Sequence, residues 1–131
     1  MKEKRHLIEC VNAHLALSAL MDKELDYQTA YAVLGLRRAL SEHVAFFKEA
    51  ERALLEKYAA RGEDGEILWE GEGKFVFREP SKCEEFRKQH KELGMVEVSG
   101  IQPFYGRRPK EIRPAVLLAL EGFLIFEEDA I

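Results

Sequence analysis

The chain has 131 residues, of which 47% are hydrophobic and 34% are charged. This length and composition are typical of one globular domain that needs neither a disulfide nor a metal to fold, and they argue against a disordered chain or a membrane protein. A formal net charge of −4 argues against broad nucleic-acid binding. The first residues lead into an amphipathic segment rather than a signal peptide, so we expect a cytoplasmic protein.

Two helices are predicted in the first half of the chain. Apolar residues recur every three or four positions from about residue 5 to residue 21, which predicts an amphipathic helix. Asp26 is expected to cap a second helix that begins near Tyr27 and ends before Gly62. Gly35 is the weak point of this helix. The apolar stripe of the second helix consists of Val33, Leu36, Leu40, Val44, Phe47, Leu54 and Tyr58.

The second half of the chain is predicted to contain short strands and short helices. Hydrophobicity alternates with a period of two in residues 66–70 and 74–78, which predicts a β-hairpin. The other predicted elements, in chain order, are a helix from Pro80 to Gly94, a strand over 95–98, a loop over 102–114, a helix from Pro114 to about Gly122 and an extended tail over 123–126.

Together these elements predict an α+β fold. It consists of a helical hairpin with one long amphipathic helix, a small antiparallel β-sheet and a short C-terminal helix. We expect a single domain over residues 1–131, with the helical hairpin in 1–62 and a small α+β part in 63–131.

The length of the second helix predicts self-association. A helix of this size is about 50 Å long, whereas a compact domain of this chain length is about 36 Å across. The first helix is too short to cover the whole stripe, so we expect a homo-oligomer with the stripe residues at its interface. The alternative is a helix that is kinked at Gly35 and covered within one chain.

No pattern in the chain predicts a catalytic, metal or cofactor site. The histidines lack the spacing of metal ligands, and the serines lack the surroundings of a nucleophile. Cys10 and Cys83 lie far apart and are expected to be buried free thiols. The Gly71-Glu72-Gly73 segment lacks the lysine and the third glycine of a phosphate-binding loop, so a hairpin turn explains it better. We therefore expect a protein that is not an enzyme and uses no cofactor.

One segment is a candidate binding site. Residues 102–114 combine four cations and two aromatic side chains and lead into a helix N-terminus, whose free amides favour anions. Arginine forks can hold a phosphate while an aromatic ring stacks on a base. The alternative is a solvated loop whose arginines pair with glutamates and whose aromatic rings fill the core. The candidate residues are Phe104, Tyr105, Arg107, Arg108, Lys110 and Arg113.

The chain combines a leucine-rich first helix, a long helix ending in residues 47–58, a Gly65 turn, a strand at 75–77 and a helix at 86–93. In this order of parts, over about residues 7–98, it resembles a family of small proteins of unknown function that tailed bacteriophages and prophages encode. The resemblance implies a viral accessory or virion-assembly protein that acts inside an infected bacterium. It implies no catalytic residues.

Two functional hypotheses follow. The first is a non-enzymatic, oligomeric phage or prophage protein that binds another virion component or a host factor through the segment from Phe104 to Arg113. The second is a protein that sequesters an anionic nucleotide, such as a host defence signal, at an oligomer interface. In that case Arg107, Arg108, Lys110 and Arg113 would hold the phosphate, and Tyr105 the base.

Overall fold

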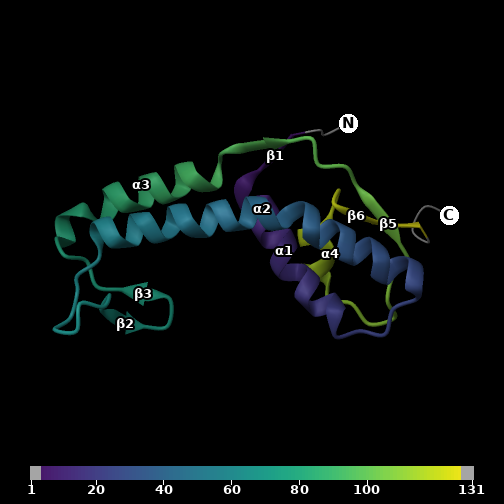
Figure 1. Ribbon diagram of the computed structural model, residues 1–131, viewed down its shortest axis with the longest axis horizontal. Coiled ribbons are helices and arrows are strands. Elements are labelled where there is room, and N and C mark those ends of the chain that lie inside the picture. The colour runs from purple at the N-terminus through teal and green to yellow at the C-terminus, as the bar shows by residue number, and fades with distance from the viewer. Residues whose placement is uncertain (1–3, 128–131) are drawn as a thin grey trace.

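The computed structural model describes residues 4–127 and shows an elongated α+β molecule built along one long helix (Figure 1). The α+β prediction is confirmed. The elements in chain order are β1 (Lys4–His6), α1 (Leu7–Met21), α2 (Tyr27–Tyr58), β2 (Trp69–Gly71), β3 (Lys74–Phe75), a 3-10 turn (Pro80–Lys82), α3 (Cys83–Gly94), β4 (Glu97–Ser99), β5 (Phe104–Gly106), α4 (Pro114–Leu120) and β6 (Leu124–Phe126).

Helix α2 begins at the predicted cap and is not interrupted. The side chain of Asp26 accepts a hydrogen bond from the Thr29 backbone amide, which satisfies one of the free amides of the first turn. The helix continues through Gly35 for 32 residues, which corresponds to about 48 Å. A Cβ atom at Gly35 would lie 2.7 Å from the Phe104 ring, so the glycine leaves space for that ring.

The main core lies at one end of the molecule. There α1 folds back against the first half of α2, and α4, β5 and β6 pack on the same helices (Figure 1). The core is mainly aliphatic because apolar residues at helical spacing on α1 and α2 face one another. Its fully buried side chains include Leu7, Cys10, Leu17, Leu20, Leu36, Leu40 and Leu120.

The second half of α2 extends beyond this core and packs against α3, and the hairpin of β2 and β3 lies at the same end of the molecule (Figure 1). Aromatic rings fill this end: Phe86 contacts the rings of Phe75 and Tyr58 and stacks on His90. The hydroxyl of Tyr58 donates a hydrogen bond to Glu85 at 2.7 Å, which raises the pKa of the tyrosine and lowers the pKa of the carboxyl. The part of α2 that exceeds a compact domain is therefore covered within the same chain.

Within residues 4–127 the strands form three separate pairs rather than one small antiparallel sheet. Strand β1 pairs with β4 and β2 pairs with β3, both antiparallel, whereas β5 and β6 are parallel. The prediction of a loop over 102–114 is therefore wrong for Phe104–Gly106. This segment forms strand β5 because β6 supplies its hydrogen-bonding partner. The predicted 63–131 part is also divided in space, because the hairpin and β5 lie at opposite ends of α2.

Candidate functional site

Strand β5 places the predicted binding segment along the first turns of α2. The ring of Phe104 lies over Gly35, and Gly106 lies against Thr29, where a Cβ atom would come within 2.9 Å of the threonine methyl. Successive side chains of a strand point to opposite faces, so Tyr105 points away from the helix and is about half exposed. Phe104 thus packs against the core, as the alternative interpretation of this segment expected, and only Tyr105 is open to a ligand.

The residues after β5 are fixed to the start of α2 by one buried threonine. The backbone amide of Arg107 donates to the Thr29 hydroxyl at 2.7 Å, and this hydroxyl donates to Asp26 at 2.6 Å. The hydrogen bond from Thr29 holds the pKa of the Asp26 carboxyl below its usual value. The backbone of Arg107, the first cation of the segment, is therefore held in a fixed position at the start of α2.

Three of the four predicted cations line one surface pocket. Arg107, Arg108 and Lys110 face the loop between α1 and α2, in a pocket of about 520 Å³. Arg113 does not line this pocket, because it lies at the start of α4 and is exposed. The loop adds Lys23 to the pocket, but it also adds two carboxylates, and a third comes from Glu111. The pocket therefore has mixed charge rather than the purely basic lining expected for a phosphate site.

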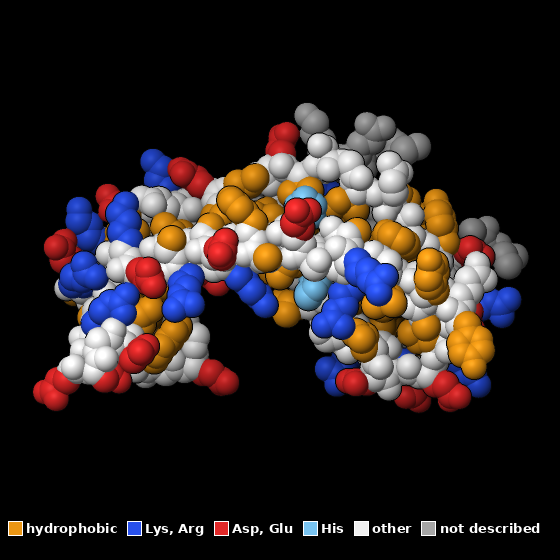
Figure 2. Space-filling model, viewed as in Figure 1, with side chains coloured by type: hydrophobic (Ala, Val, Ile, Leu, Met, Phe, Trp, Pro, Cys, Tyr) orange, Lys and Arg blue, Asp and Glu red, His pale blue; other side chains and the backbone are white. Residues whose placement is uncertain are grey.

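An exposed aromatic stripe lies beside this pocket. Tyr27 and Tyr31 are 96% and 79% exposed on successive turns of α2, and Leu34 follows on the same face. Tyr27 directly follows the pocket residue Asp26, and Tyr105 is two residues before Arg107, so the stripe and the pocket adjoin. Figure 2 shows hydrophobic side chains gathered over this end of the molecule.

We call the residues Tyr27, Tyr31, Leu34 and Tyr105 the tyrosine surface. Sequence reasoning missed its helical part because the longer apolar stripe lies on the opposite, buried face of α2. The signal was present, since Tyr27, Tyr31 and Leu34 are spaced by four and three residues and so share a helix face. What the sequence lacked was any indication that none of residues 4–127 covers this face.

The predicted oligomer stripe lies inside the chain. Val33, Leu36, Leu40, Val44, Phe47 and Tyr58 are all buried, and Leu54 is half-buried. The first half of the stripe packs against α1 and β5, and the second half against α3. The expectation that these side chains face a second copy is therefore corrected for the six buried residues, which are covered within one chain. Self-association through α2 would have to use another face of the helix or the half-buried Leu54.

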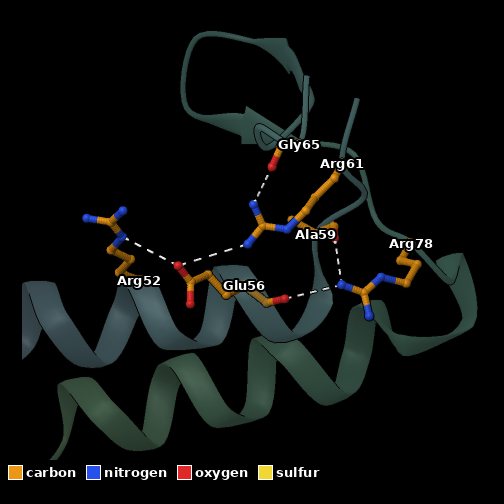
Figure 3. Close-up of polar contacts among 6 residues, drawn as sticks. All are labelled: Arg52, Glu56, Ala59, Arg61, Gly65 and Arg78. Atoms are coloured by element: carbon orange, nitrogen blue, oxygen red, sulfur yellow. Dashed lines mark hydrogen bonds and ion pairs between the residues drawn. The ribbon is translucent and has the colours of Figure 1, made fainter. Parts of the chain in front are cut away.

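A group of arginines lies where α2 meets the hairpin, and its contacts are structural. Glu56 pairs with Arg52 at 3.6 Å and with Arg61 at 4.0 Å, and Arg61 also donates to the Gly65 carbonyl (Figure 3). Arg78 donates to two carbonyls at the C-terminal end of α2. These bonds satisfy carbonyls that the helix end leaves free and hold the hairpin against it.

The titratable groups within residues 4–127 do not meet the requirements of a metal site. In that range no three His, Cys, Asp or Glu side chains lie close enough together to hold a metal ion. Burial raises the pKa of the Cys10 thiol to about 11, so it is a poor nucleophile. Burial, with Arg37 and Lys48 nearby, lowers the pKa of His14 and favours its neutral form.

Comparisons of the chain with protein-family models, with curated proteins and with solved structures gave no match in any of the three. The resemblance to tailed-phage proteins therefore remains a prediction. Among the described residues, no helix combines the length and the apolar character that crossing a bilayer requires.

Proposed function

We propose that the protein is a non-enzymatic binding module whose tyrosine surface, with the adjoining charged pocket, docks onto a protein partner. The observation that supports this most directly is the exposure of Tyr27 and Tyr31, two neighbouring aromatic side chains that no described part of the chain covers. Tyrosine and arginine are enriched among the residues that dominate protein interfaces, and an apolar centre with a polar rim is the usual interface arrangement.

The charges beside the tyrosine surface favour a protein over a free nucleotide. Arg107, Arg108 and Lys110 share their pocket with Glu24, Asp26 and Glu111. These carboxylates would repel a phosphate, whereas a protein surface can place groups of both signs against such a rim. The helix after the cations is α4, which has only seven residues, so it adds little to anion binding. Thermal stabilisation by ATP or pyrophosphate that disappears in Arg107→Ala/Arg108→Ala would support the nucleotide hypothesis instead.

The phage resemblance suggests where to look for the partner. A virion component or a host factor in the cytoplasm of an infected bacterium is the class of partner that this resemblance implies. Self-association is part of the same proposal only if a second copy contacts the tyrosine surface, because the buried stripe of α2 is not accessible.

The test is affinity capture from infected cells, followed by binding measurements with the purified partner. Tyr27→Ser/Tyr31→Ser removes two exposed rings and should leave the fold intact. The matched control is Phe46→Ser, which removes an exposed ring of the same helix outside the tyrosine surface. We expect the double variant to bind at least about tenfold more weakly than the control. Equal binding by both variants, or no captured partner, would overturn the proposal.

A further inference from the structure

A second concave site lies between the hairpin and α3. These two elements lie at the far end of α2 from its first turns, which carry Tyr27 and Tyr31 (Figure 1). Its cavity is about 570 Å³, which is within the range of about 300–1,000 Å³ that small-molecule sites occupy. Apolar side chains from three segments form most of its wall: Phe75, Val76, Phe77, Pro80, Cys83 and Phe86.

The aromatic rings form a continuous apolar surface that remains partly open. The ring of Phe75 lies 4.6 Å from that of Phe77 and 5.0 Å from that of Phe86, measured between centroids. All three side chains are only half-buried, so each ring keeps part of its surface in contact with solvent. A flat apolar molecule would cover this surface and would pack edge-on or offset against the rings.

The rim of the cavity carries charge. Lys74, Arg87 and Glu70 line it. Arg87 is already paired with Glu84 at 3.1 Å. Lys74 is exposed and makes no ion pair with another residue among those described, so its ammonium group is available to a ligand. The cavity thus combines an apolar floor with one available cation, Lys74, and one carboxylate, Glu70, at its edge.

We propose that this cavity binds a small molecule with a flat apolar body and one anionic group, with the body on the phenylalanine rings and the anion on Lys74. This site is separate from the tyrosine surface and does not depend on the protein-binding proposal. Cys83 lies in the cavity wall and is half-buried, so a bulky group attached to its sulfur would occupy the site.

Two related dyes test both parts of the proposal. Anilinonaphthalene sulfonate has a flat apolar body with one anion, and phenylnaphthylamine has the same body without the anion. Both fluoresce when they leave water for an apolar site. The chain has one tryptophan, Trp69, and it is paired with Phe75 across the hairpin. A dye in the cavity should therefore quench Trp69 emission, because energy transfer decreases steeply with distance, whereas a dye on the tyrosine surface should not.

We expect the wild-type protein to bind one anionic dye with quenching of Trp69. Lys74→Glu should weaken binding of the anionic dye by about tenfold and leave the affinity for the neutral dye unchanged. Lys88→Glu, which reverses a charge on α3 outside the cavity, is the matched control. Equal affinity of the two dyes, or an equal effect of the two lysine variants, would overturn the role of Lys74.

Selective alkylation provides a test that needs no substitution in the rings. N-phenylmaleimide, which attaches a bulky group to a thiol, should modify Cys83 in the folded protein and spare Cys10, which is fully buried and has a raised thiol pKa. Modified wild-type protein should lose dye binding, whereas Cys83→Ser treated in the same way should retain it. Dye binding that survives modification of Cys83, or that occurs without quenching of Trp69, would place the dye elsewhere and overturn the site.

Discussion

The two ends of α2 are stabilised in different ways. At the α1 end, aliphatic side chains are completely removed from water, and several are less than 2% exposed. At the hairpin end, the rings of Phe75, Phe77 and Phe86 contact one another but stay half-buried. Burial of apolar area is the main stabilising term in folding. We infer that the α1 end carries most of the global stability and that the hairpin end opens locally at lower cost.

The largest expected effect compares two leucines of the same helix. Leu40 is fully buried in the α1 end, whereas Leu54 is half-buried beside α3. Leu40→Ala should lower the free energy of unfolding by roughly 2–5 kcal/mol. Leu54→Ala should cost only about 1–2 kcal/mol, because less apolar area is removed. Urea denaturation measures both, and equal costs would indicate that Leu54 is covered in solution, as in an oligomer.

The second prediction concerns local opening at the hairpin end. Phe86 contacts the rings of Tyr58, Phe75, Phe77 and His90. Phe86→Ala should therefore lower the free energy of unfolding by about 2 kcal/mol. Hydrogen exchange should become faster in β2, β3 and α3 but not in α1. Trp69→Ala, at a side chain that is more than half exposed, is the control. Faster exchange along the whole chain would contradict the idea of two ends with separate stability.

The third prediction tests the contact between α2 and β5. Gly35→Ala should gain roughly 1 kcal/mol in helix propensity and lose roughly 1–3 kcal/mol through the close approach to Phe104. We expect a net loss of about 1 kcal/mol. Phe104→Leu should cost less in the Gly35→Ala background than in the wild type, because the smaller side chain relieves the contact. A Gly35→Ala variant more stable than the wild type would show that the ring moves aside freely.

The smallest effect concerns the pH dependence of the Asp26 cap. Asparagine also caps helices, so Asp26→Asn keeps the cap and removes only the charge. The folded-state pKa of Asp26 is below its usual value of 3.8, so the charge stabilises the fold above that pH and loses its effect as the pH falls below it. Thermal denaturation should show a wild-type advantage at pH 7 that disappears in acid. Asp22→Asn, in the same loop, is the control and should keep the acid dependence of the wild type.

The helices and the hairpin could be predicted because their signals are local. The Asp26 cap, the three-and-four spacing of apolar residues in α2 and the positive backbone φ at Gly73 in the hairpin turn each act over a few residues. The candidate site could be predicted only in part. Arg107, Arg108 and Lys110 do share a pocket, but Phe104 packs inward and Arg113 points elsewhere.

What the sequence determined by itself is approximately where the helices begin and end and which helix faces are apolar. Only the tertiary structure decided what covers each face. The stripe of Leu36 and Leu40 is covered by segments far away along the chain, and the ring of Phe104 finds its place on Gly35, 69 positions earlier. The same packing leaves Tyr27 and Tyr31 uncovered. Periodicity marks a face as apolar or polar, but burial depends on contacts between distant segments, which no local pattern specifies.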